Sequence, residues 1–250
     1  MEELIINNYK EKYLNQVFEN IQEKFRKRKI ISLIENNFQP TMNICEIGCG
    51  RDSIFNYIET ANYMTIIEPQ SDFLKLQPDF INKKQVNKIN NKLEKVSELF
   101  KNRFELVILS GLIHEVDDPV NFLRHVREVC SENGLIVITT NNTKSIHRLI
   151  GLEMGELLEI NELSNTARYF NQYSGSIMIS NILDMCKKVG FRVDSYGTFM
   201  PKILPHSTMQ ELITNEIINI DFIESLYAIG ETGVLNDFGS EIFLVVKNTP

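Results

Sequence analysis

The 250-residue sequence has no tryptophan, only seven prolines, and no apolar run near the ~18 to 20 residues that cross a membrane. It starts Met1-Glu2-Glu3, without the basic and apolar segments of a secretory signal. The missing apolar run excludes a membrane-spanning helix, and the missing leader argues against export. We therefore expect a soluble, cytoplasmic protein.

Cysteine is also scarce, and its spacing is uninformative for metal binding. The sequence contains Cys45, Cys49, Cys130 and Cys186. These residues form no Cys-x-x-Cys pair, and no Asp and His cluster with metal-ligand spacing accompanies them. We expect reduced thiols in the core and no bound metal.

Positive charge is in deficit, with a formal net charge of −7 at pH 7. Nucleic-acid binding relies on many Lys and Arg side chains that neutralise phosphates, so the balance argues against such a partner. One basic run, Lys24 to Lys29, breaks the trend. We interpret it as a solvated helix face, with a phosphate contact as the alternative.

The most informative stretch present is a buried strand that leads into a glycine-rich turn, residues 43 to 52. Gly48 and Gly50 lack Cβ atoms, so the chain can turn tightly and a ligand can lie against its backbone. We expect a helix over Ser53 to Ile58 whose amide groups point at the ligand. The pattern is typical of a nucleotide-like cofactor.

The identity of that cofactor depends on Asp52 and Ser53. A dinucleotide turn has a third glycine where this chain has Ser53, and its pyrophosphate would lie near the Asp52 carboxylate. Like charges a few ångströms apart repel by about 1 to 4 kcal/mol. S-adenosylmethionine carries no phosphate and presents cationic groups, which suit acids such as Glu46 and Asp52.

A second apolar strand, residues 62 to 67, ends at Glu68 and is stopped by Pro69. An acid at this position can accept hydrogen bonds from both ribose hydroxyls of an adenosine cofactor. The order of turn and acid is more specific than either feature alone.

The sequence resembles the class I S-adenosylmethionine-dependent methyltransferases in Glu46-x-Gly48-x-Gly50, in Glu68 and in residues 104 to 119. The resemblance implies S-adenosylmethionine as the cofactor. The cofactor residues it implies are Glu46, Gly48, Gly50, Glu68, Pro69, Asn91, Ser110 and Gly111. The chain departs from the family pattern at Asp52, where a third glycine is usual, and after the third strand, where Asn90 or Asn91 would meet the adenine.

The resemblance and the strand-helix alternation together predict an α/β fold, with a doubly wound, mostly parallel, seven-stranded sheet of the Rossmann-like methyltransferase type. We expect one domain over residues 1–250. Its parts would be N-terminal helices (1–36), a cofactor-binding core (37–142), a substrate cap (143–174) and a C-terminal part of the core (175–250) with a helical insertion at 202–235. The last strand, 241 to 247, would lie antiparallel beside the strand at 191 to 199.

Methyl transfer from a sulfonium is an in-line displacement, so holding the acceptor on the right axis can supply most of the rate. A hydroxyl or neutral amine acceptor must also lose a proton to a base. His114, in the loop after the fourth strand, is our candidate base; the alternative is that its ring packs on the cofactor or binds a backbone carbonyl.

The cap and its neighbours carry candidate substrate residues, which are Tyr13, His147, Arg148, Arg168, Tyr173 and Lys202. Basic members of this set would suit a phosphate or carboxylate on a small polar acceptor. The segment 142 to 155 resembles methyltransferases that modify bacterial surface polysaccharides and sugars. Two other functions remain open, an NAD-dependent oxidoreductase and a catalytically silent binding module with this fold.

Overall fold

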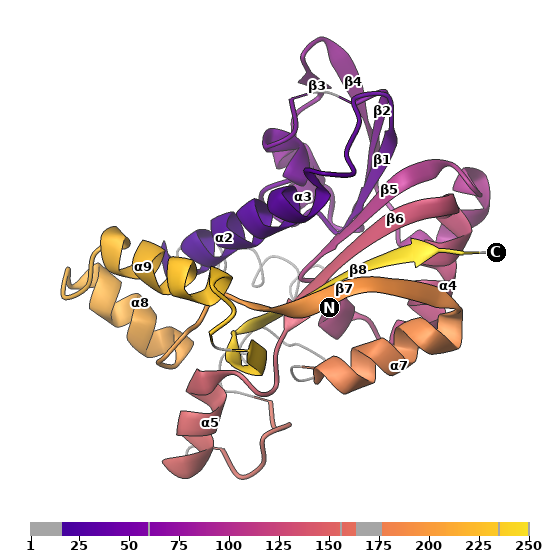
Figure 1. Ribbon diagram of the computed structural model, residues 1–250. Coiled ribbons are helices and arrows are strands. Elements are labelled where there is room, and N and C mark those ends of the chain that lie inside the picture. Colours follow the sequence, from indigo (N-terminus) through magenta and orange to yellow (C-terminus); the bar gives the residue numbers. More distant parts are fainter. Residues whose placement is uncertain (1–16, 60, 156, 164–176, 235, 250) are drawn as a thin grey trace, which may run out of the picture.

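The computed structural model describes residues 17–59, 61–155, 157–163, 177–234 and 236–249, and an eight-stranded sheet is its centre (Figure 1). The strand order is β3-β4-β2-β1-β5-β6-β8-β7. The strands are β1 (Asn43–Ile47), β2 (Tyr63–Ile67), β3 (Phe80–Ile81), β4 (Lys84–Ile89), β5 (Phe104–Ser110), β6 (Cys130–Asn141), β7 (Phe191–Phe199) and β8 (Glu241–Asn248).

Five neighbouring strands of the sheet, in the order β4-β2-β1-β5-β6, are parallel. Strand β8 lies between β6 and β7 and is antiparallel to both. The prediction of a mostly parallel, Rossmann-like sheet with an antiparallel last strand is therefore confirmed. The predicted number of strands is one too low, because the two-residue strand β3 pairs with β4 as a short hairpin.

Helices cover both faces of the sheet (Figure 1). They are α2 (Val17–Ile34), α3 (Ser71–Leu76), α4 (Pro119–Val129), α5 (Ile146–Glu153), α7 (Ile179–Val189), α8 (His206–Thr214) and α9 (Ile220–Glu231). Alternate side chains of each strand point to opposite faces. Cys45 and Ile47 of β1 accordingly pack in the core beneath α4 and α7, and Ile44 packs in the second core with α2.

Several connections in the first half of the sheet are shorter than predicted. A helix over Ser53 to Ile58 is wrong, because only the 3-10 turn η1 (Ile54–Asn56) forms there. Between β4 and β5 the chain makes the 3-10 turns η2 (Leu93–Lys95) and η3 (Ser97–Phe100) in place of a helix. Two further 3-10 turns are η4 (Ile113–Glu115) and η5 (Asn236–Phe238).

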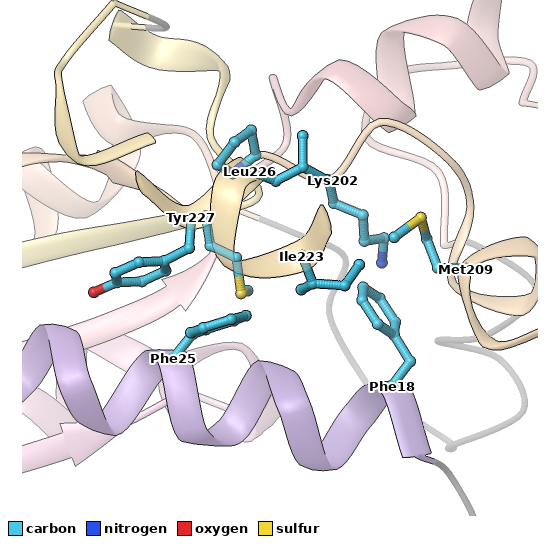
Figure 2. Close-up of a pocket in the computed structure, with 9 residues that line it drawn as sticks. Phe18, Phe25, Lys202, Met209, Ile223, Leu226 and Tyr227 are labelled. Atoms are coloured by element: carbon cyan, nitrogen blue, oxygen red, sulfur yellow. The ribbon is translucent and has the colours of Figure 1, made fainter. Parts of the chain in front are cut away.

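The predicted helical insertion at 202–235 forms α8 and α9, which lie beside α2 (Figure 1). Phe18 and Phe25 of α2 face Ile223 and Tyr227 of α9 in a separate apolar cluster (Figure 2). The rings of Phe25 and Tyr227 stack with centroids 4.6 Å apart. The insertion therefore packs against both α2 and the end of β7, whose Phe199 belongs to the same cluster.

Candidate active site

The glycine turn after β1 has the backbone that its sequence predicted. Gly48 and Gly50 have φ angles of +72° and +58°, in the left-handed region that side chains disfavour. The Gly48 amide donates to the Ile67 carbonyl at 2.9 Å, which ties the turn to β2. An added Cβ on Gly50 would meet one atom within 4 Å among the described residues, Glu23 Oε1 at 3.8 Å. Among the described residues, a carbon atom of another molecule could therefore approach the Gly50 backbone closely.

Glu46 lies beneath this turn and is fully buried. Its carboxylate accepts from Lys27 Nζ at 2.8 Å, from the Ile54 amide at 3.0 Å and from the Ser53 hydroxyl. Because the amides that follow the turn bind Glu46 and Gln77, they do not point at a ligand as predicted. The expectation for the first helical turn was thus wrong, since internal side chains take those amides.

Asp52 also finds partners on its own side of the turn. Its carboxylate accepts from Asn56 Nδ2 at 2.7 Å and from the Tyr57 hydroxyl at 2.6 Å. These contacts hold the Asp52 carboxylate in the turn, where the pyrophosphate of a dinucleotide would lie.

Glu68 follows β2 and is 4% exposed. Its carboxylate accepts from the Gln70 amide at 2.8 Å and from the Gly50 amide at 3.3 Å. Burial raises the pKa of Glu68 to about 6, although these two hydrogen bonds oppose the shift. The acid therefore lies against the glycine turn.

The next predicted cofactor residues are Pro69, which follows Glu68 at the carboxyl end of β2, and Asn91 or its alternative Asn90, which follow β4. The side chain of Asn90 donates to the carbonyls of Glu68 and Pro69, at 3.0 Å in each case. Asn91 is half-buried and its side-chain oxygen accepts from the Lys92 amide. Of the two candidates for the adenine contact, Asn90 thus uses its side-chain amide to hold the loop after β2.

The loop after β5 brings Ser110 and Gly111 to the same edge of the sheet. Gly111 has a φ of +69°, and its amide donates to the carbonyl and the hydroxyl of Thr139. An added Cβ on Gly111 would lie 2.9 Å from Arg26 Nη1. Arg26 of α2 therefore packs directly over this loop.

The basic run on α2 is not the solvated face that we expected. Lys27 is buried against Glu46, and Arg26 forms a two-pronged ion pair with Glu241 at 2.6 and 2.7 Å. Only Lys24 and Arg28 of the run are exposed, and Arg28 pairs with a residue of α9. The run points inward because acids at the ends of β1 and β8 lie beneath α2.

His114, in η4, is 3% exposed. Its Nδ1 lies 3.2 Å from the Thr140 hydroxyl and its Nε2 lies 3.2 Å from Asn141 Nδ2. With the amide donating to Nε2, the proton is on Nδ1. Burial and then the charge of Arg26 lower the pKa of His114 to about 3, so the imidazole is neutral at neutral pH.

Three of the predicted substrate residues come together at the cap. Arg148 on α5 is buried and donates to the carbonyls of Ile160 and Glu162. His147 precedes Arg148 on α5, and Lys202 follows β7. Burial and then the nearby charge of Lys202 lower the pKa of His147 well below its usual range. The other three, Tyr13, Arg168 and Tyr173, lie outside the described residues.

Sequence reasoning missed the acidic side chains that partner the inner face of α2. Glu23 pairs with Arg51 of the glycine turn at 2.9 Å, and Glu241 pairs with Arg26. Glu241 begins a strand 215 residues away from Arg26, and no local pattern marks the pairing. The one available signal was the basic run itself.

These features fit an adenosine cofactor without phosphates. Left-handed glycines, a backbone at Gly50 that another molecule could approach, a buried acid at the end of β2 and a retained negative charge at Asp52 all occur at one edge of the sheet. Fold and site together define a Rossmann-like α/β enzyme of the methyltransferase type. Among the described residues, no group of three His, Cys, Asp or Glu side chains could hold a metal ion.

The profile of the methyltransferase domain family matches residues 18–196, and the chain belongs to this family. It is an S-adenosylmethionine-dependent methyltransferase, and S-adenosylmethionine is its cofactor. The alternative of an NAD-dependent oxidoreductase is not favoured. No curated protein matches the sequence.

Solved structures of S-adenosylmethionine-dependent methyltransferases share this fold at low sequence identity. One from Thermotoga maritima is 13% identical with a TM-score of 0.58, and the match covers 98% of this chain and 100% of that one. One from Archaeoglobus fulgidus is 16% identical with a TM-score of 0.54, covering 92% and 99% of the two chains. One from Mesorhizobium loti is 12% identical with a TM-score of 0.53, covering 86% and 96%.

In the part of the chain that the structure describes, none of the helices combines the length and the apolar character that crossing a membrane requires.

Proposed function

We propose that the chain methylates a hydroxyl group of a small polar acceptor, such as a phosphorylated or nucleotide-linked sugar or another precursor of a surface polysaccharide. When bound, the cofactor supplies an electrophilic methyl group on a sulfonium. The observation that carries the proposal is the position of His114, a buried imidazole in the loop after β5 whose ring nitrogens contact Thr140 and Asn141 at the carboxyl end of β6. The segment 143–174 acts as the cap, and residues 1–250 act as one domain.

The roles of the individual residues follow from this arrangement. Gly48, Gly50 and Glu68 hold the adenosine part, with Pro69, Asn91, Ser110 and Gly111 around it. The Glu46 carboxylate holds η1 and α2 against the turn through Ser53, Ile54 and Lys27, so its part in cofactor binding is to fix the backbone.

His114 takes the proton from the acceptor hydroxyl. With its pKa lowered to about 3, the imidazole is a weak base but is never blocked by a proton at neutral pH. Its Nδ1 proton on Thr140 leaves Nε2 as the accepting atom, which requires the Asn141 amide to give way to the acceptor hydroxyl. Transfer of the proton late in the displacement suits a weak base, because the hydroxyl becomes acidic as the methyl bond forms.

We favour oxygen as the acceptor atom because hydroxyl groups are the abundant nucleophiles of a sugar. The Arg26 and Lys202 charges would keep an amine unprotonated and reactive, so they do not decide between oxygen and nitrogen. We place the activity in the cytoplasm, which the four buried, free cysteines support.

The experiment is a mass-spectrometric screen for S-adenosylhomocysteine release with phosphorylated sugars, sugar nucleotides and matched unphosphorylated sugars. Release together with a product 14 mass units heavier on a hydroxyl is the expected result. Product methylated on nitrogen would overturn the choice of oxygen. Cofactor binding without release for any acceptor would instead support the silent binding module.

A further inference from the structure

A largely buried lysine side chain at the junction of α2, α5 and α8 has no carboxylate in contact within the part of the chain that the structure describes. Lys202 is 8% exposed, and its Nζ lies 5.7 Å from the centroid of the Phe18 ring. Figure 2 shows its side chain reaching between Phe18 and Met209. Among the described residues, no carboxylate oxygen lies within 4 Å of this ammonium. A buried charge in this position costs several kcal/mol unless a partner compensates it.

The acids of the described residues that lie nearest to Lys202 act on its ammonium from a distance and not by direct contact. Glu19 of α2 and Glu241 at the start of β8 are the nearby acids, and Arg148 is the other nearby cation. Glu241 is already bound by both prongs of Arg26. Glu23 lies beside Arg26 and Glu162 lies beside Arg148, so these acids act on the other two cations. Burial outweighs the two acids and lowers the pKa of Lys202 to about 8.

A second unsatisfied group lies at the same place. His147 Nδ1 is buried and has no hydrogen-bond partner among the described residues. Buried nitrogen atoms of this kind are rare in proteins, because an unmade hydrogen bond costs ~1 to 3 kcal/mol. The imidazole also lies against the backbone carbonyl of Lys202. The Lys202 ammonium can bind the anionic oxygens of a ligand, and His147 Nδ1 can accept from a protonated oxygen or, in its other tautomer, donate to an anionic one.

We propose that Lys202 and His147 form an oxyanion site that binds a carboxylate or phosphate group of the methyl acceptor. The identification of the ligand as the acceptor rests on the proposed function, but the anion site itself does not. Arg148 holds the cap backbone through Ile160 and Glu162 and contributes charge only. His206 of α8 lies 3.7 Å from Glu19, so it supports that acid beside the site.

The test measures anion binding in the absence of cofactor. Inorganic phosphate and acetate are titrated at pH 7 against chloride of equal ionic strength, with heat of binding and the midpoint of thermal unfolding as readouts. The variants are Lys202→Met and His147→Phe, and the matched control is Lys95→Met, which removes an exposed lysine. S-adenosylmethionine is titrated separately into each sample.

We expect phosphate or acetate to raise the unfolding midpoint of the wild type and of Lys95→Met. Lys202→Met should weaken anion affinity at least tenfold and His147→Phe at least threefold, with cofactor affinity unchanged. Preference for phosphate identifies a phosphorylated acceptor, and preference for acetate identifies a carboxylate. Because Lys202→Met removes a buried charge, its unliganded form should be at least as stable as the wild type; if it fails to fold, Lys202→Gln replaces it.

The inference is overturned if neither anion acts on the wild type beyond chloride, or if Lys202→Met binds the anion as well as the wild type. Either result with normal cofactor binding refutes the anion site alone. Anion binding without any cofactor binding refutes the proposed function and leaves the site intact.

Discussion

Arg26 and Glu241 form a bidentate ion pair between the inner face of α2 and the first residue of β8, with N–O distances of 2.6 and 2.7 Å. Glu241 is 1% exposed. Burial opposes the charged form of Arg26, but the carboxylate outweighs it and raises the pKa of the guanidinium above its usual range. The pair docks α2 over the loop that contains Gly111.

Glu241→Gln should lower the free energy of unfolding by about 3 to 5 kcal/mol, because it leaves a buried guanidinium without its counter-charge. Urea denaturation at pH 7 measures the loss. The matched control is Glu224→Gln, which breaks the exposed pair with Arg28, where both side chains are nearly half exposed. That control should change stability by less than about 1 kcal/mol; equal losses in the two variants would contradict the assigned role of burial.

The second buried pair, Lys27 with Glu46, predicts strong coupling between the two positions. Lys27→Met alone should cost about 3 to 5 kcal/mol because it leaves the Glu46 carboxylate uncompensated. The double variant Lys27→Met with Glu46→Gln should recover much of that loss, since no buried charge remains. A double-mutant cycle by chemical denaturation checks this, and additive effects would argue against the pair.

Glu68 predicts a pH dependence of cofactor binding. Its pKa, raised to about 6, means that the carboxylate is protonated below that pH and loses its capacity to accept from two ribose hydroxyls. Affinity for S-adenosylmethionine should therefore fall by up to about tenfold between pH 7 and pH 5, as titration calorimetry would show. In Glu68→Gln the affinity should be low and independent of pH over this range.

The same shift has a consequence for stability with the opposite sign. A carboxyl group whose pKa is raised on folding holds its proton more tightly in the native state, so stability falls as the pH rises from about 4.5 to about 6. Glu68→Gln should remove that part of the pH dependence of unfolding. If the wild type and the variant show the same slope there, Glu68 does not titrate as described.

His114 predicts a rate effect without the usual histidine inflection. His114→Ala should lower kcat by about 100- to 10,000-fold if the imidazole is the base, with cofactor affinity retained. Because the pKa of His114 is lowered to about 3, kcat at saturating cofactor should stay flat from pH 8 to pH 5. Full turnover by His114→Ala would remove the residue from catalysis, and a loss of rate near pH 6.5 would contradict its described burial.

Local sequence was sufficient for the features that depend on neighbouring residues. The buried strand β1, the glycine turn after it and the acid at the end of β2 were all predicted, because backbone freedom and strand burial are properties of short segments. The length of the first connection was not predictable in this way. The Ser53 amide donates to the side-chain oxygen of Gln77, which is 24 residues away in the sequence, and no local pattern marks this contact.

The parallel α/β sheet, the glycine turn and the class of cofactor could be predicted from the sequence, since each depends on contiguous residues. The packing of distant segments was needed to show that the basic run on α2 faces inward, that His114 is neutral, and that Lys202 lies near His147. The reason is electrostatic: a charge acts according to the acids and the solvent around it, and those neighbours come from strands and helices up to 215 residues away.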